Sequence, residues 1–210
     1  MERTKKLVLI GGGGHCKSIL DSAMNSKKYS GFAITEKKGS SQYDILTPYV
    51  VGDDDQLPFL FQNGFKNAII SVGSIKSTET RRRLSQVAEK IGYTLDTVLD
   101  PSAVISMFTT IGKGCFVGKR VIINASATIG DNVIINSGAI IEHDCWVGDF
   151  SHVSVGAVLC GGVTINNDVF IGANATIIQG IEVGARSIIG AGSIVLCDVP
   201  EDSVVYGIWK

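Results

Sequence analysis

The chain has 210 residues, a length that allows one domain or two, and its formal charge of −1 comes from 19 basic and 20 acidic side chains. A protein that binds nucleic acid through its phosphates carries a marked excess of positive charge, so this class is excluded. Hydrophobic residues make up 45% of the chain and charged residues 19%, which indicates a globular protein rather than a disordered one.

Neither a membrane span nor an export signal is visible in the sequence. No apolar stretch reaches the roughly 18 residues that cross a bilayer, and the segment MERTKKLVLIGGGG lacks the pattern of a signal peptide. The five cysteines are odd in number and contain no Cys-x-x-Cys pair, which favours reduced thiols. We therefore expect a cytoplasmic protein that does not insert into membranes.

The two halves of the chain differ in composition. Residues 1–100 carry 14 basic and 11 acidic side chains, whereas residues 101–210 carry 5 and 9. This shift, together with the proline at position 101, predicts a domain boundary near Asp100-Pro101. We expect one domain over residues 1–100 and a second over residues 101–210.

The first hundred residues alternate between predicted strands and predicted helices. The strands are expected at 6–10, 32–35, 68–72 and 94–99, and the helices at 17–25 and 77–90. The first strand is a continuous apolar run, which is typical of a parallel strand buried on both faces. This alternation predicts a small, doubly wound, Rossmann-like α/β domain.

A glycine loop over residues 11–15, GGGGH, lies between the first predicted strand and the first predicted helix. Backbone N–H groups and the helix dipole favour an anion at such a position, so the loop is a candidate phosphate cradle. The dinucleotide pattern G-x-G-x-x-G fits at Gly11 and Gly13 but fails at Cys16, and no Walker lysine-serine pair follows. From the residues alone, the loop is either a ligand cradle or a tight turn.

The second half carries a repeat of six residues. An aliphatic residue recurs at every sixth position from Ile105 to Val195, sixteen times in succession. A helix has a period of 3.6 and a strand a period of 2, so neither explains this spacing. A parallel β-helix does, with three hexapeptides per coil and residues 18 apart stacked on one another. We expect about five coils, and we expect the Gly or Asn that usually follows the aliphatic residue to occupy the strained corners.

The chain has only three histidines, at positions 15, 143 and 152. His143 follows the inward Ile141 by two residues, a slot that faces outward in this repeat. Its neighbours one coil below and above are Ala125 and Gly161, whose small side chains leave a groove beside the imidazole. His143 is either a functional group in this groove or a solvated surface residue.

His152 stacks between Ile134 and Phe170, where it either packs on the aromatic ring or binds a ligand. A zinc site on a β-helix needs three histidines and the repeat has two, so no metal is expected. Cys115 and Cys145 fall in an inward slot and are expected to be core residues rather than nucleophiles.

Two motifs carry a resemblance to a known family. The stretch IIEHDCWVGDFSHVSVGAVLCGGVTI (residues 140–165) and the loop GGGGH resemble the bacterial hexapeptide-repeat sugar acetyltransferases of the NeuD/PglD type, and the match runs over nearly the whole chain. The resemblance implies a left-handed β-helix, a homotrimer, and acetyl-CoA bound between adjacent helices.

The resemblance also implies roles for particular residues. His143 matches the general base of the family, and Asp144 matches the acidic residue that raises its basicity. The residues implied in acetyl-CoA binding are His152, Gly161, Ala173 and Ala191. Those implied in binding the nucleotide-linked sugar are Gly13, Gly14, His15, Gly73 and Asn136. The chain has Thr35-Glu36 where some members of the family have paired aspartates after the second strand, and it has Gly207-Ile208-Trp209-Lys210 in place of the usual Gly-x-Pro-Ala-Lys.

These observations lead to one principal hypothesis and several alternatives. The principal hypothesis is direct N-acetylation of a nucleotide-linked amino sugar by acetyl-CoA. The close alternative is O-acetylation of sialic acid or another sugar, and the distant one is a non-catalytic β-helix that binds a nucleotide sugar. A nucleotidyltransferase with an appended β-helix is disfavoured, because a first domain of 100 residues is too short for it.

Overall fold

The computed structural model describes residues 5–37 and 45–210, so residues 1–4 of the amino-terminal segment considered above lie outside it. The chain forms two compact units, one of Met1–Gly73 and Glu79–Pro101, the other of Ser74–Thr78 and Ser102–Lys210. The chain passes from the first unit to the second between residues 101 and 102, and the second unit also takes in a short earlier segment. The segment Ser74–Thr78 belongs to the second unit because the Thr78 hydroxyl donates to Asp168 and the Ser74 carbonyl accepts from His152.

The first unit contains a five-stranded sheet in the order β3-β2-β1-β4-β5, in which every neighbouring pair is parallel. Its strands are β1 (Lys5–Ile10), β2 (Tyr29–Thr35), β3 (Val50–Gly52), β4 (Asn67–Ile70) and β5 (Thr94–Leu95), followed in the chain by β6 (Val98–Leu99). Its helices are α1 (Gly14–Asn25), α2 (Leu57–Gln62) and α3 (Glu79–Ile91), with short 3-10 helices η1 (Thr47–Tyr49) and η2 (Asp54–Gln56). The predicted Rossmann-like domain is thus confirmed.

Two elements of the first unit differ from their predicted bounds. Helix α1 begins at Gly14 rather than at residue 17, because Gly13 has an extended backbone and already acts as its N-cap. The strand expected over 94–99 is divided into β5, which pairs with β4, and β6, which does not belong to this five-stranded sheet. Within residues 5–37 and 45–210, no helix is both long and apolar enough to cross a membrane.

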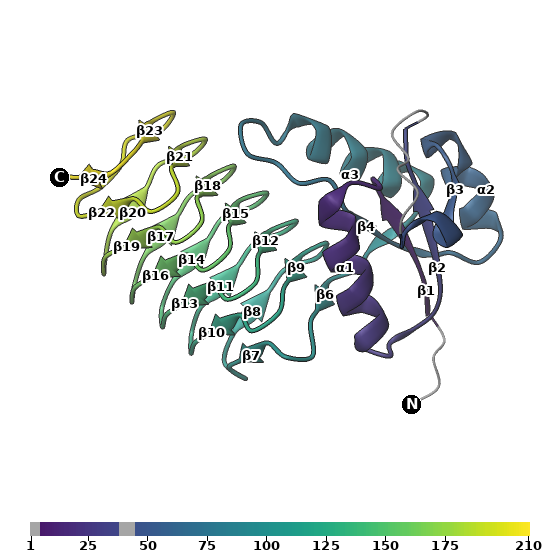
Figure 1. Cartoon of the computed structure of the whole chain (residues 1–210), viewed down its shortest axis with the longest axis horizontal. Helices are drawn as coiled ribbons and strands as arrows, with labels where there is room; N and C mark the ends of the chain where they lie inside the picture. The colour runs from purple at the N-terminus through teal and green to yellow at the C-terminus, as the bar shows by residue number, and fades with distance from the viewer. Residues whose placement is uncertain (1–4, 38–44) are drawn as a thin grey trace. The chain divides into compact units, whose positions relative to one another are not determined.

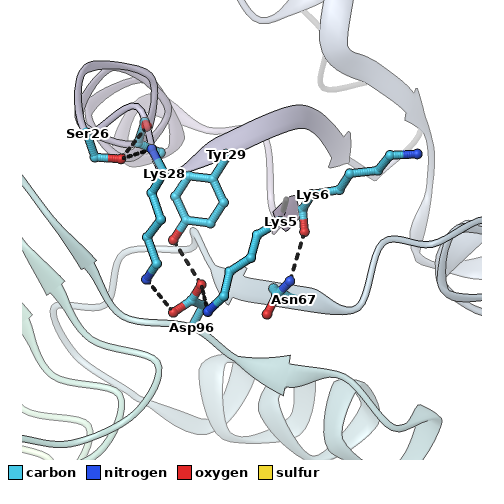
Figure 2. A network of polar contacts seen from close by, with 8 residues as sticks. Lys5, Lys6, Ser26, Lys28, Tyr29, Asn67 and Asp96 are labelled. Carbon is cyan, nitrogen blue, oxygen red and sulfur yellow. Dashed lines mark hydrogen bonds and ion pairs between the residues drawn. The ribbon is translucent and has the colours of Figure 1, made fainter. Parts of the chain in front are cut away.

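Asp96 is the centre of a polar network near the amino-terminal ends of strands β1 and β2. Its carboxylate lies 2.8 Å from Lys28 Nζ, 3.1 Å from the Tyr29 hydroxyl and 3.4 Å from Lys5 Nζ, and Figure 2 shows the three side chains converging on it. Burial by itself would raise the pKa of Asp96, but the bonds to Lys28, Lys5 and Tyr29 outweigh it and lower that pKa. The glycine loop lies at the opposite, carboxyl-terminal end of β1, so this network stabilises the fold and is not part of the candidate phosphate cradle.

The second unit is a left-handed β-helix of two-residue strands in three parallel stacks, drawn from teal to yellow in Figure 1. The β13 face consists of β7 (Val104–Ile105), β10 (Ile122–Ile123), β13 (Ile140–Ile141), β16 (Val158–Leu159), β19 (Thr176–Ile177), β22 (Ile194–Val195) and β24 (Ile208–Trp209). The β14 face consists of β8 (Thr110–Ile111), β11 (Thr128–Ile129), β14 (Trp146–Val147), β17 (Thr164–Ile165) and β20 (Glu182–Val183). The β15 face includes β9 (Phe116–Val117), β12 (Ile134–Ile135), β15 (His152–Val153), β18 (Phe170–Ile171), β21 (Ile188–Ile189) and β23 (Val204–Val205).

The strand register confirms the predicted coil of 18 residues. Ile141 pairs with Leu159, and Val147 pairs with Ile165, one coil above in each case. These inward side chains are fully buried and form one continuous aliphatic core. Burial of such side chains stabilises a protein by about 1.5–3 kcal/mol each, so the six-residue pattern supplies most of the driving force for this fold.

The corners of the β-helix differ from the expectation in one respect. Every sixth residue from Gly114 to Gly192 has a positive φ, and this is the third residue after each inward aliphatic one, not the first. The glycines directly after the aliphatic residues are needed for a different reason. A Cβ on Gly172, for example, would lie 2.5 Å from the backbone nitrogen of Ala191 in the next coil, so only glycine permits this close approach.

Candidate active site

His143 and Asp144 occupy the corner between β13 and β14, and both side chains are 64% exposed. Asp144 has a φ of 61° and is one of the left-handed corner residues. Aspartate tolerates this conformation better than most side chains do. The turn brings the Asp144 carboxylate to 2.8 Å from His143 Nδ1.

This contact determines what the imidazole can do. A carboxylate only accepts hydrogen bonds, so Nδ1 carries the hydrogen and Nε2 of the neutral ring is unprotonated. The bond to Asp144 raises the pKa of His143 above its ordinary value of 6.5, and the charge of Glu142 adds to this effect. His143 therefore presents an exposed nitrogen base whose affinity for a proton is enhanced.

Gly161 lies one coil above His143, as the spacing predicts. The Gly162 N–H donates to the His143 carbonyl over 2.9 Å, which keeps the two corners in register. A Cβ built on Gly161 would lie 2.6 Å from His143 Nε2. The imidazole therefore rests over the bare backbone of Gly161.

His152 lies on β15 and is only 8% exposed. Its Nδ1 is 2.8 Å from the Ser74 carbonyl and its Nε2 is 2.7 Å from Asn136 Nδ2. Because a carbonyl only accepts, Nδ1 carries the hydrogen and Nε2 accepts from the Asn136 amide. The ring also packs edge-on against Phe170, with centroids 5.1 Å apart. Of the two sequence-based interpretations, packing on the aromatic ring is confirmed, and both ring nitrogens are engaged within the chain.

The residues implied in acetyl transfer fall into two groups within one chain. His143, Asp144 and Gly161 lie on the edge that joins the β13 face to the β14 face. Asn136, Ala173 and Ala191 lie on a different edge, which joins the β15 face to the β13 face. Ala173 and Ala191 do stack one coil apart, since the Gly192 N–H donates to the Ala173 carbonyl over 2.8 Å.

Two buried cysteines lie in the β-helix, at positions 115 and 145. Cys145 is buried, and burial raises the pKa of its thiol to about 11, which leaves it protonated at neutral pH. Cys115 is buried as well, as predicted. Apart from residues 1–4 and 38–44, no three His, Cys, Asp or Glu side chains are grouped so that they could hold a metal ion.

The glycine loop of the first unit lies between the carboxyl ends of β1 and β4, where the strand order reverses. Ligands of doubly wound sheets bind at this switch point. Gly13 and Gly14 are exposed, no side chain caps α1, and a Cβ on either glycine would meet nothing within 4 Å. Gly73 follows β4, and a Cβ on it would lie 3.8 Å from His15 Cβ. The fold thus gathers these four residues around open space.

Glu36 is a residue of this loop region that the residue pattern left without a role. It directly follows β2, and its carboxylate accepts a hydrogen bond from the Gly12 N–H. The neighbouring Thr35 donates to Asp54 over 2.8 Å. One feature of the sequence could have pointed to Glu36: it stands directly after the second predicted strand, where the resemblance places paired aspartates in some members of the family.

Comparisons with known proteins agree with both units. Residues 6–88 match the PglD N-terminal domain, and residues 108–143 and 162–197 match the bacterial transferase hexapeptide (six repeats). No curated protein matches the chain.

Two solved structures are similar over nearly the whole chain. One is a variant of GDP-perosamine N-acetyltransferase from Caulobacter crescentus in complex with CoA and GDP-perosamine, with 33% identity, 97% of this chain and 93% of that chain covered, and a TM-score of 0.87. The other is the acetyltransferase domain of PglB from Neisseria gonorrhoeae FA1090 in complex with acetyl coenzyme A, with 30% identity, coverage of 97% and 96%, and a TM-score of 0.89.

The fold and the two family matches define a hexapeptide-repeat acyltransferase with an amino-terminal α/β domain. More particularly, the chain belongs to the bacterial sugar acetyltransferases of the NeuD/PglD type. The family resemblance noted from the sequence is thereby confirmed, and so, at the level of the family, is the expectation of an enzyme that uses acetyl-CoA.

Proposed function

We propose that this protein transfers an acetyl group from acetyl-CoA directly to the amine of a nucleotide-linked amino sugar, with His143 as general base. The observation that carries the proposal is the 2.8 Å bond between His143 Nδ1 and Asp144, which leaves Nε2 as an exposed base of raised pKa. Family membership supports the class of reaction, and the open glycine loop supports an acceptor that carries phosphate.

In the proposed reaction the acceptor amine attacks the thioester carbonyl while His143 Nε2 removes the proton of the amine. The new C–N bond forms, the C–S bond breaks, and the CoA thiolate leaves and takes up the proton that His143 removed from the amine. Asp144 stabilises the imidazolium that forms on His143. General-base assistance of this kind contributes typically 10²–10⁴-fold to the rate. No covalent intermediate on the enzyme is needed, because the thioester is already activated.

We assign acetyl-CoA to the edges of the β-helix. Gly161 would present backbone to it beside His143, while Ala173 and Ala191 have side chains small enough to line a channel for its pantetheine arm. Asn136 and His152 would border this channel as a preformed pair. Because Nε2 of His152 accepts from Asn136, the ring is not a donor to the thioester oxygen in this arrangement, and backbone N–H groups are the remaining candidates for that role.

The nucleotide part of the acceptor suits the loop around Gly13 and Gly14. The first N–H groups of α1 have no side-chain cap there, and an N-terminus of this kind favours a diphosphate. His15 and Gly73 border the same space. A nucleotide-linked sugar brings a diphosphate to this loop, whereas free sialic acid carries only one carboxylate, and this difference favours a nucleotide-linked amino sugar over sialic acid.

We further propose a homotrimer. Because His143 and the pair Ala173 and Ala191 lie on different edges of one chain, a complete acetyl-CoA site would need edges from two copies. An exposed apolar surface supports the same conclusion: Val104, Ile194 and Ile208 on the β13 face are 66%, 42% and 64% exposed, and Val155 on the edge beside it is 51% exposed. Light scattering is expected to give about 67 kDa, three times the 22.3 kDa of one chain, and a monomer would contradict the shared site.

The decisive experiment measures thiol release from acetyl-CoA with a panel of nucleotide-linked amino sugars and with free sialic acid, and identifies each product by mass spectrometry. An N-acetylated nucleotide sugar is the expected product. Faster turnover with free sialic acid would instead support O-acetylation. If no acceptor releases thiol while nucleotide sugars still bind, the protein is a binding module and the proposal fails.

A further inference from the structure

We propose that Gly161 is a positioning residue, whose missing side chain leaves room for the imidazole of His143 to lie where its Nε2 can act as the base. This inference deepens the proposed function and rests on it. Gly161 would then contribute to catalysis through His143, in addition to any contact that its backbone makes with acetyl-CoA.

The backbone conformation of Gly161 does not explain why glycine stands there. Its neighbour Gly162 has a φ of 69°, a left-handed conformation that favours glycine, whereas Gly161 has no positive φ. An alanine at position 161 would therefore meet no backbone strain of its own. The requirement for glycine must come from the surrounding space.

That space is filled by one side chain. The three atoms nearest to a Cβ on Gly161 all belong to the imidazole of His143: Nε2 at 2.6 Å, Cε1 at 2.7 Å and Cδ2 at 3.3 Å. Real Cβ atoms essentially never show contacts below 3.0 Å, so the imidazole of His143 would have to move. Since this side chain is 64% exposed, it can move without disturbing the core.

Gly172 illustrates the opposite case. A Cβ there would meet the backbone nitrogen of Ala191 at 2.5 Å, so the coils themselves would have to separate. At Gly161 the fold can accept a methyl group, but the imidazole of His143 cannot keep its position. Displacement of the ring alters both the 2.8 Å bond to Asp144 and the direction of Nε2. A misplacement of about 1 Å can cost on the order of 10²-fold in rate.

The test compares Gly161→Ala with Gly31→Ala. Gly31 is a matched control because it also lacks a positive φ, lies in β2, and would place a Cβ in ordinary contact at 3.6 Å from Lys6. We expect Gly161→Ala to lower kcat about 10- to 100-fold with little change in KM for acetyl-CoA and in Tm. Gly31→Ala is expected to change neither kcat nor KM. A raised KM with unchanged kcat would instead mean that Gly161 serves only the approach of acetyl-CoA, and would overturn the proposal.

A double-variant cycle adds a second criterion. If Gly161 acts through His143, then Gly161→Ala causes no further loss of kcat in a His143→Ala background. An equal loss in both backgrounds would overturn the proposal.

NMR titration of the ring protons supplies a readout that does not depend on activity. The chain has three histidines, so the His143 signal is assigned by its disappearance in His143→Ala. We expect Gly161→Ala to lower the pKa of His143 toward 6.5 as the bond to Asp144 weakens, whereas an unchanged pKa and line position would contradict positioning. If His143→Ala retained full turnover, the base role itself would fail, and the titration would still decide whether Gly161 orients the ring.

Discussion

The imidazole of His143 and the carboxylate of Asp144 belong to adjacent residues, and yet their side chains meet at 2.8 Å. In an extended strand, adjacent side chains point to opposite faces. The corner after β13 removes this restriction, because Asp144 takes a left-handed backbone and turns its carboxylate back toward the histidine. The repeat therefore supplies not only a scaffold but also the local turn that couples the two groups.

Replacement of His143 by alanine is expected to lower kcat by on the order of 10²-fold or more, because the attacking amine then loses the general base that takes its proton. KM for acetyl-CoA should change little, and Tm should stay the same because the side chain is exposed. Steady-state kinetics with a nucleotide-linked amino sugar measure both constants. Turnover close to that of the unchanged protein at neutral pH would refute the base assignment.

The pH dependence of kcat/KM should report the contact with Asp144. His143 acts as a base only when neutral, so activity is lost as the pH falls through its pKa, which the bond to Asp144 raises above 6.5. Asp144→Asn removes the charge but keeps the size of the side chain. We expect this variant to have lower activity and an acidic limb that moves to lower pH. A limb that stays in place would show that another group titrates.

Substitution of Gly13 by valine is expected to affect only the sugar substrate. A Cβ at this position meets nothing within 4 Å, and the backbone has a φ of −75°, so the fold accepts a larger side chain. The branched side chain would project into the space assigned to the diphosphate and raise KM for the nucleotide sugar. Parallel titrations of the two substrates test this, and a kinetically silent variant would argue against a phosphate cradle.

His152→Phe should separate packing from hydrogen bonding at β15. Phenylalanine retains the contact with Phe170 but removes the hydrogen bonds that His152 makes with the Ser74 carbonyl and the Asn136 amide. Loss of these buried bonds costs about 1–3 kcal/mol of the free energy of unfolding. We expect a raised KM for acetyl-CoA together with measurable turnover. Urea denaturation and kinetics measure the two effects, and abolished turnover in a folded variant would assign His152 a direct chemical role.

Asp96→Asn tests the network of the first unit. The variant should lose about 1–3 kcal/mol of the free energy of unfolding at neutral pH, since a buried charge no longer balances Lys28 and Lys5. In the unchanged protein the pKa of Asp96 lies below 3.8, so its stabilising effect is present above that value and is lost as the pH falls through the lower folded pKa. The stability of the variant should therefore fall less over this acidic range. Identical acid unfolding curves would contradict the expectation.

Much of the β-helix and of its site could be predicted because the repeat converts distance along the chain into distance in space. A coil of 18 residues makes Gly161 the neighbour of His143 in the next coil and Phe170 the neighbour of His152, and both pairs follow from the spacing alone. The strict aliphatic period predicts which side chains form the core, and it predicts that the position of His143 faces outward, as its 64% exposed side chain does.

Other features were decided only by the tertiary structure. The bond from His152 to Ser74 joins residues 78 positions apart, and the bond from Gly12 to Glu36 joins the ends of two different strands. No period relates such segments, because their meeting depends on how non-repeating elements fold. The orientation of the His143 ring over Gly161 is likewise invisible in the sequence: spacing determines which residues are neighbours, whereas side-chain packing and hydrogen bonding determine where the atoms that perform the chemistry point.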